Sequence, residues 1–264
     1  MAGGGSAGHW LEDTLRVACR TLAGTVPRDA ALRSGADFDA EAGRFTLSFL
    51  GRPVTVAYPS GEVGAAGGPG GAELPLVHRI LLLHYLVQAS GLPPRNRWVA
   101  LHELPGGSFH YGGFQARALR PLARFFGPRP ELLGPAARTL GGWPLGLGHA
   151  GAVVPALPRL AVGVVVWRGG EEFPPSCNIL YDAAAATYLT TEDLEYLGIA
   201  VAEGLLEAGP RLLEAGAGGG PAAAQEQEEG TGGPAAGGGR RRAPPRRAGA
   251  RARKGGAGVD PRVG

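Results

Sequence analysis

The chain has 264 residues, of which 44% are hydrophobic and 19% are charged. This apolar content can build one large core or two small ones, which excludes a wholly disordered protein. However, 47 Gly and 23 Pro make up more than a quarter of the chain, a level typical of aperiodic low-complexity sequence. Part of the chain is therefore expected to be unfolded.

The net charge of +3 originates in the C-terminal segment, residues 216–264, which holds nine basic and four acidic residues. Gly, Ala and Pro fill 31 of its 49 positions, so the segment has too little apolar surface to offset the entropy cost of ordering. We expect a folded domain over residues 1–215 and a disordered tail over residues 216–264.

A basic tail can associate weakly with nucleic acid through phosphate charge, without reading the bases. The arginines available for such contacts are Arg240, Arg241, Arg242, Arg246 and Arg247. No aromatic residue alternates with them to offer a stacking surface for bases. A solvated extension is therefore the preferred interpretation, and nucleic-acid binding is the alternative.

The cysteine pattern and the hydropathy indicate a soluble chain in a reducing compartment. Cys19 and Cys177 are too few for a disulfide framework and too far apart for a local metal site. The N-terminus lacks the basic and apolar segments of a secretion signal, and no apolar run is long enough to span a membrane. We therefore expect a cytoplasmic protein without a membrane partner.

The first part of the chain is expected to combine two helices with a hairpin. Apolar residues recur at helical spacing over residues 9–22, and alternating runs at 45–50 and 54–58 flank a glycine-containing turn. Residues 61–71 are rich in Gly and are expected to form a loop. Residues 76–89 are apolar around most of their circumference, as expected of a helix buried in the core.

The second part of the chain mixes strands and helices. In chain order we expect a strand over 98–104, a glycine-rich loop over 105–113, helices over 114–126 and 131–140, strands over 161–167 and 178–181, and a helix over 191–208. Thr190 and Asp193 have capping-box spacing at the start of this last helix, and Pro210 is expected to end or kink it. Because no regular βαβ repeat occurs, the predicted fold class is α+β: a single domain with helices packed on a mixed or antiparallel sheet.

Two nucleotide-binding motifs can be tested on the sequence. Residues 146–151 match the pattern G-x-G-x-x-G, which works only where a strand leads into a helix. Pro155 and Pro158 follow closely and forbid that helix. The only lysine, Lys254, lies in the tail, which excludes a P-loop.

The histidines do not form a metal-binding pattern. His78 and His84 lie six residues apart on the expected core helix, about 240° around its axis, so they cannot share one ion. Each is expected to pack and hydrogen-bond within the core. The sequence thus predicts neither a metal site nor a cofactor-binding residue.

A polar segment follows the strand predicted over residues 98–104. It contains His102, Glu103, His110 and Tyr111 around a Pro-Gly-Gly turn. In an extended strand, His102 faces one side of the sheet with apolar neighbours and Glu103 faces the other. Such ionisable groups need a partner or a shifted pKa. A structural turn, whose glycines permit positive φ and whose Glu103 pairs with an arginine, is the preferred interpretation, and a binding loop is the alternative.

A second polar segment, with Glu171 and Glu172, follows the strand that is predicted to end at Trp167. Carboxylate pairs can act as general acid and base, although adjacent residues seldom converge on one substrate. Binding groups often lie on loops that a rigid sheet holds. We therefore expect residues 102–111 and 168–177 to approach each other at one edge of the sheet.

These patterns favour a small-ligand-binding or accessory module, with a pocket formed by the loops after Leu104 and Trp167. The ligand-binding candidates are His102, Glu103, His110, Tyr111, Glu171 and Glu172. The alternative is an enzyme in which Glu103, with His102 or His110 and one of the two later carboxylates, performs acid–base chemistry. No Ser or Cys lies in a nucleophile pattern such as G-x-S-x-G.

Eight short motifs follow each other in an order found in one bacterial and archaeal family. They are LLLHYL (81–86), WVALHELPGG (98–107), YGGF (111–114), PLARFFG (121–127), LGG (140–142), WRGGEEFPPS (167–176), ILYDAAAATYL (179–189) and TEDLEYLG (191–198). Over most of residues 8–208 the chain resembles the family called domain of unknown function 3786. The resemblance implies no particular activity, cofactor or catalytic residue. Members occur largely in anaerobes and are sometimes fused to iron–sulfur segments, whose clustered cysteines this chain lacks.

Overall fold

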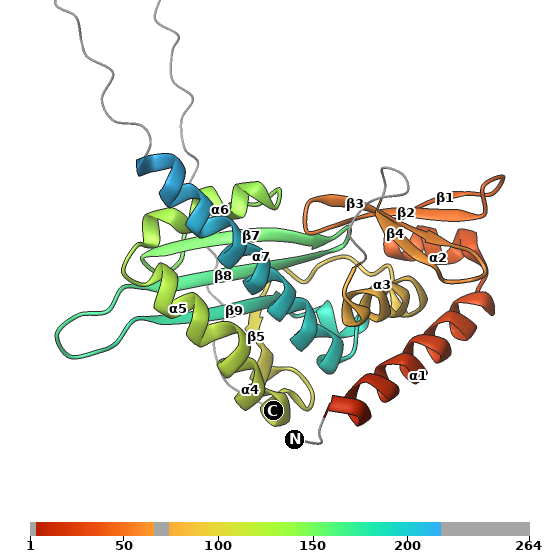
Figure 1. Ribbon diagram of the computed structural model, residues 1–264, viewed down its shortest axis with the longest axis horizontal. Coiled ribbons are helices and arrows are strands. Elements are labelled where there is room, and N and C mark those ends of the chain that lie inside the picture. Colours follow the sequence, from red (N-terminus) through yellow and green to blue (C-terminus); the bar gives the residue numbers. More distant parts are fainter. Residues whose placement is uncertain (1–3, 66–73, 218–264) are drawn as a thin grey trace, which may run out of the picture. The chain divides into compact units, whose positions relative to one another are not determined.

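The computed structural model describes residues 4–65 and 74–217, and Figure 1 shows them as helices packed with two antiparallel sheets. This arrangement confirms the predicted α+β class. The predicted tail, with its arginines, lies outside the described residues. The domain boundary expected after residue 215 stays a prediction, and the last described helix continues to Ala217.

The described helices and strands have the following bounds. The helices are α1 (Gly4–Ala23), α2 (Pro27–Ser34), α3 (Leu76–Gln88), α4 (Gly107–Phe114), α5 (Arg120–Phe126), α6 (Leu133–Thr139) and α7 (Thr191–Ala217). One sheet has the order β1 (Asp37–Asp39), β2 (Arg44–Phe49), β3 (Arg52–Ala57), β4 (Val63–Ala65). The other has the order β5 (Trp98–Ala100), β9 (Ser176–Asp182), β8 (Leu160–Trp167), β7 (Ala150–Leu157), β6 (Trp143–Pro144).

The first sheet is an antiparallel meander. The predicted hairpin is confirmed as β2 and β3, which are joined by Leu50 and Gly51. Both turn residues have a positive φ, 51° and 76°, as a two-residue turn between twisted strands requires. The loop expected over 61–71 is partly wrong, because β4 pairs with β3. Residues 66–73 lie outside the described residues.

The second sheet has the most buried strand of the fold at its centre. In β8 the side chains of Val162, Val164 and Val166 are fully buried, which confirms the predicted apolar strand. Helix α5 contacts β8 and β9, while α6 and α7 contact β7, so these helices cover one face of the sheet (Figure 1). Apolar side chains on that face are removed from water, which is the main favourable term in folding.

Residues 146–151, which match G-x-G-x-x-G, lead into strand β7 and not into a helix. The sequence does not predict this strand, since Pro155 lies inside it and cannot donate a hydrogen bond to the neighbouring strand. The structure accommodates Pro155 at an irregularity in the register between β7 and β8.

Helices α3 and α7 form much of the helical core and contact each other. The predicted buried helix over 76–89 is confirmed as α3, in which Leu82, Leu83 and Leu86 are fully buried. Helix α7 continues through Pro210, so that residue does not end it. Just before Pro210 the helix packs closely on α5, because a Cβ atom at Gly209 would lie only 2.3 Å from the ring of Phe125.

The strand predicted over 98–104 is confirmed only over 98–100, and the loop predicted over 105–113 is wrong from Gly107 onward. The extended strand stops at Ala100, residues 101–103 form a 3₁₀ turn, and α4 begins at Gly107. A Cβ atom at Gly107 would lie 1.8 Å from the carbonyl oxygen of Leu101, so only glycine permits this close approach. Here the glycines allow a tight turn to pack on a helix and do not mark a loop.

Candidate functional site

Two carboxylates in the first turns of α7 are buried. Asp193 and Glu195 are the charged side chains that the fold buries within residues 4–65 and 74–217, at 7% and 9% exposure. A buried carboxylate is costly unless hydrogen bonds satisfy its oxygens. Each of the two has a histidine partner from another helix, His84 on α3 and His110 on α4. The start of α7 is therefore the most polar part of the described interior.

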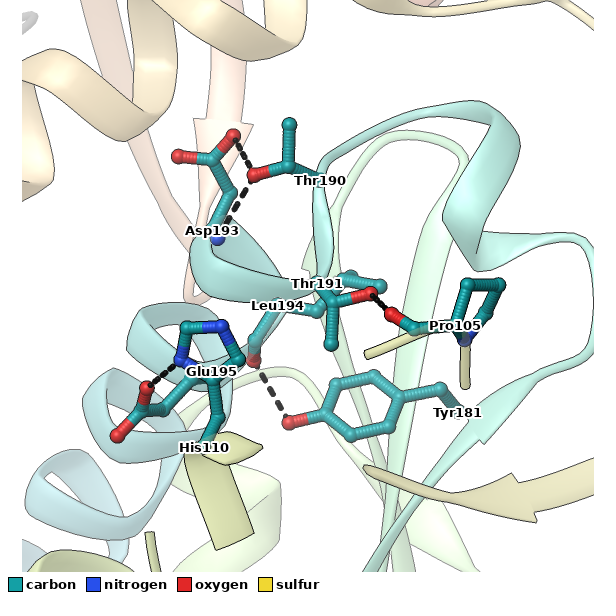
Figure 2. A network of polar contacts seen from close by, with 8 residues as sticks. All are labelled: Pro105, His110, Tyr181, Thr190, Thr191, Asp193, Leu194 and Glu195. Atoms are coloured by element: carbon teal, nitrogen blue, oxygen red, sulfur yellow. Dashed lines mark hydrogen bonds and ion pairs between the residues drawn. The ribbon is translucent and has the colours of Figure 1, made fainter. Parts of the chain in front are cut away.

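Asp193 uses both of its oxygens. One oxygen lies 2.8 Å from Nδ1 of His84, and the other accepts the hydroxyl hydrogen of Thr190 at 2.8 Å. The same Thr190 hydroxyl accepts the backbone N–H of Asp193 at 3.1 Å, which confirms the cap predicted at the start of α7. A negative side chain is also stabilised at a helix N-terminus. These contacts hold Asp193 in one orientation, and Figure 2 shows the two that it makes with Thr190.

The Asp193 contact determines which nitrogen of His84 carries hydrogen. An ionised carboxylate only accepts hydrogen bonds, so Nδ1 of His84 must be the donor. In the neutral ring, Nε2 then carries a lone pair. Among the described residues, no hydrogen bond is made by Nε2 of His84. This nitrogen can accept a hydrogen bond from a ligand or take up a proton.

Glu195 makes a second pair, in which its oxygen lies 2.9 Å from Nδ1 of His110 (Figure 2). The surroundings are tightly packed, because a Cβ atom at Gly113 would lie 3.3 Å from the other oxygen of Glu195. Tyr181 donates its hydroxyl hydrogen to the carbonyl of Leu194 at 2.8 Å. Burial, and then the charge of Glu195, raises the pKa of Tyr181 well above its usual range. Tyr181 is therefore a neutral structural donor.

A cavity of about 210 Å³ opens beside the first of these pairs. Its walls come from α1, α3 and α7, and it is lined by Trp10, Leu11, Thr14, Val77, Ile80, Leu81, His84, Thr190, Glu192, Asp193 and Tyr196. Most of these side chains are apolar, and the polar ones gather where α7 begins. We call this space the α1–α3–α7 cavity. It is smaller than pockets for drug-sized ligands, which hold about 300–1,000 Å³.

The structure brings part of the first predicted segment together. The rings of His102 and Tyr111 meet edge to face, with centroids 4.8 Å apart, and His110 contacts Glu195. Glu103 pairs with no arginine among the described residues; its carboxylate accepts the backbone N–H of Ala100 at 2.6 Å. The face assigned to His102 in an extended strand is also wrong, because the 3₁₀ turn reorients the chain there.

The second predicted segment, residues 168–177, lines a different hollow from the α1–α3–α7 cavity. Glu171 and Glu172 are exposed and line an open hollow that also contains Gly127, Pro128 and Arg168. Arg168 pairs with Glu131 at 3.6 Å, a surface ion pair of small energetic weight.

The sheet register offsets the two predicted segments. Ala100 at the end of β5 pairs with Leu180, whereas Trp167 at the end of β8 pairs with Ser176. Measured along β9, the end of β5 therefore lies four residues, about 13 Å, from the end of β8. The two segments leave the sheet in the same direction. Their shared pocket stays a prediction.

The roles of Asp193 and Glu195 are not among those that the sequence predicts. The partners of these carboxylates are 109 and 85 residues away in the chain, so no local spacing connects them. The one available signal was the position of two acidic residues among the leucines of an apolar helix face. The described residues contain no cluster of three or more His, Cys, Asp or Glu side chains that could hold a metal ion.

The thiols are poorly suited to nucleophilic chemistry. Burial raises the pKa of Cys177 to about 12, and burial also raises that of Cys19 despite the opposing charge of Arg79. The thiolate is the reactive form, so both thiols are weak nucleophiles at neutral pH. The chemistry that the described site can perform is hydrogen bonding and proton transfer through His84.

Within residues 4–65 and 74–217, no helix combines the length and the apolar character needed to cross a membrane.

No curated protein and no solved structure matches the chain. A family model described as "Domain of unknown function (DUF3786)" matches residues 26–203. That range holds α2 to α6 and the first half of α7, including both carboxylate–histidine pairs. The chain therefore belongs to the DUF3786 family, as the order of its motifs predicts.

Proposed function

We propose that this chain is a small-ligand-binding module and that its ligand occupies the α1–α3–α7 cavity. The observation that carries the proposal is the fixed orientation of His84 at the wall of that cavity. Asp193 holds Nδ1, so Nε2 is free to meet a ligand atom. Binding sites commonly combine apolar walls with a few polar groups placed in this way.

The walls define the chemical class of the ligand. Val77, Ile80 and Leu11 supply apolar contact, and Nε2 of a neutral His84 accepts one hydrogen bond. Glu192, which is exposed, adds negative charge at the same wall. The ligand is a small, largely apolar molecule that carries one hydroxyl or amino group. The loops after Leu104 and Trp167 stay a second proposed contact region, with Glu103 already engaged by the backbone.

Matched variants on α1 can test the cavity. Thr14 lines it, whereas Thr21 lies outside its lining; both hydroxyls bond the carbonyl four residues earlier on the same helix. Thr14→Leu should fill the cavity, and Thr21→Leu should leave it open. We expect equilibrium dialysis against a small-molecule extract, followed by mass spectrometry, to show one compound enriched by the wild type and by Thr21→Leu.

The same compound should not be enriched by Thr14→Leu. Equal enrichment by both variants would place the ligand elsewhere. No enriched compound with any of the three proteins would contradict small-ligand binding itself.

Acid–base catalysis is the second candidate function. It is favoured by the same Asp193–His84 pair, because a carboxylate that orients a histidine supports proton transfer at Nε2. Thr14 and Thr190 are the aliphatic hydroxyls at the cavity, which Tyr196 also lines, and each of the two already makes a hydrogen bond within α1 or the α7 cap. This arrangement favours proton transfer over covalent catalysis.

The two free thiols suit the reducing cytoplasm, which is the location that we propose.

A further inference from the structure

The face of the second sheet that is turned away from α5 and α7 carries a different kind of site. Trp98 pairs with Asp182, and Ala161 pairs with Pro155. The neighbouring pair of Tyr181 and Val162 is fully buried beneath the helices. Because successive side chains alternate between the faces of a strand, the first four residues share the opposite face.

This face is hollow at its centre and has aromatic residues at both edges. Ala161 supplies only a methyl group in the central strand, while Trp98 and Trp143 stand on the two edge strands. The ring of Trp98 reaches across the sheet, since a Cβ atom at Gly163 would lie 3.5 Å from its Cζ3 atom. The resulting cleft holds about 530 Å³, within the range of small-molecule sites. We call it the sheet cleft.

The sheet cleft leaves large apolar surface in contact with water. Trp143 is 49% exposed and Leu92 is 52% exposed, and both line it. Scattered exposed side chains are ordinary, but apolar groups that share one concave surface mark a binding site. A planar or apolar ligand body would remove these groups from water.

Asp182 offers a free carboxylate oxygen at this cleft. Its Oδ1 accepts the backbone N–H groups of Arg95 and Ala184, both at 2.8 Å. Its Oδ2 accepts no hydrogen bond from the described residues. Trp98 is the direct cross-strand neighbour of Asp182 on the same face. A carboxylate beside an indole ring suits an ammonium group, which gains both an ion pair and a cation–π contact.

Arg159 lines the same cleft with the opposite charge. One of its Nη atoms donates to the carbonyl of Leu32 at 3.1 Å, which anchors the side chain. Within the described chain, no other hydrogen bond is made by its guanidinium. Arg159 lies in the turn between β7 and β8, two positions before Ala161, and lines the cleft together with Asp182. A guanidinium group is a good partner for a carboxylate.

We propose that the sheet cleft binds a free amino acid with an apolar side chain. The ammonium group lies against Asp182 and Trp98, the carboxylate against Arg159, and the side chain against Trp143 and Pro155. This site shares no lining residue with the α1–α3–α7 cavity, so it stands independently of the function proposed there.

Isothermal titration calorimetry of the full chain tests the proposal directly. The probes are leucine, isoleucine, valine, methionine and phenylalanine, each tested with two derivatives. The N-acetylated derivative lacks the ammonium group, and the amide lacks the carboxylate. We expect saturable binding of at least one amino acid and at least tenfold weaker binding of both of its derivatives.

Conservative variants connect that binding to the cleft. Asp182→Asn keeps an oxygen for the two backbone N–H groups and removes the charge, and Arg159→Gln keeps a donor for Leu32. Each should weaken binding at least tenfold without changing the thermal midpoint appreciably. Trp143→Ala should also weaken amino-acid binding. Trp167 is 39% exposed and lies outside the cleft, so Trp167→Ala should leave the binding unchanged.

Three results would overturn the proposal. The first is no saturable binding of any of the five amino acids up to about 10 mM, a concentration well above weak metabolite affinities. The second is equal binding of an amino acid and its two derivatives. The third is unchanged binding in both Asp182→Asn and Arg159→Gln, which would place the amino acid outside the cleft.

Discussion

His84 is the residue on which the proposed site depends. The carboxylate of Asp193 accepts from Nδ1, so the neutral ring must be the Nδ1–H tautomer. We expect ¹⁵N NMR of histidine-labelled protein to show this tautomer for His84 wherever the ring is neutral. In Asp193→Asn the side-chain amide can donate as well as accept, so the tautomer should become mixed. An Nε2–H tautomer for His84 in the wild type would contradict the hydrogen bond as assigned.

His78 gives the stability of the protein a dependence on pH. Burial lowers the pKa of His78 below its ordinary value near 6.5, while the charge of Glu203 opposes the shift. The unfolded chain therefore takes up a proton at a higher pH than the folded chain does. The stabilisation is complete above about pH 6.5 and is lost as the pH falls through the folded pKa.

A variant can isolate this effect. His78→Phe keeps an aromatic ring against Phe49, which now meets His78 edge to face at 5.4 Å between centroids. Urea unfolding at pH 7 and pH 5 should show a smaller loss of stability on acidification for the variant than for the wild type. An equal loss in both proteins would show that His78 does not titrate differently in the folded state.

The thiols give a further residue-level prediction. Because burial raises the pKa of Cys177 to about 12, its thiolate fraction at pH 8 is very small. Alkylation by iodoacetamide, followed by mass spectrometry, should be much slower at Cys177 in the native protein than in urea. Equal rates in the two conditions would mean that the start of β9, where Cys177 lies, opens readily.

At the scale of elements, the start of α4 depends on one glycine. Gly107→Ala would place a methyl group 1.8 Å from the Leu101 carbonyl oxygen, so it should destabilise the fold by more than about 1 kcal/mol. Gly112 lies in the same helix and has open space around it. Gly112→Ala should therefore stabilise the fold by up to about 1 kcal/mol. Urea unfolding of both variants checks this; similar values for the two would contradict the close packing at Gly107.

The elements differ in how far their sequences determine them. Residues 76–89 and 161–167 have continuous apolar patterns, and both form the predicted elements because burial follows directly from composition. Residues 105–113 are rich in glycine and are therefore predicted to be a loop. In the structure, tertiary contacts at these glycines allow a tight turn that is followed by helix α4. The pairs of Asp193 and Glu195 could not be predicted, because they join helices that are far apart in sequence.

At the scale of the whole molecule, the described helices and sheets share one extensive core. Leu82 on α3 lies in that core and is fully buried. Leu82→Ala should cost about 2–5 kcal/mol, because the cavity left behind cannot fully collapse. Leu32, at 73% exposure, provides the control: Leu32→Ala should cost less than about 0.5 kcal/mol. Comparable losses in denaturant unfolding would mean that the core lies elsewhere.

Binding of a small ligand in the α1–α3–α7 cavity is the central claim, and the ring of His84 reports on it directly. The most direct measurement is the ¹⁵N and ¹³C NMR spectrum of the histidine rings in the presence of the compound enriched from the extract. The account predicts a saturable change at His84 Nε2, with little change at His9, and no change at His84 in Thr14→Leu. A compound that binds the protein and leaves the His84 signals unaltered would contradict it.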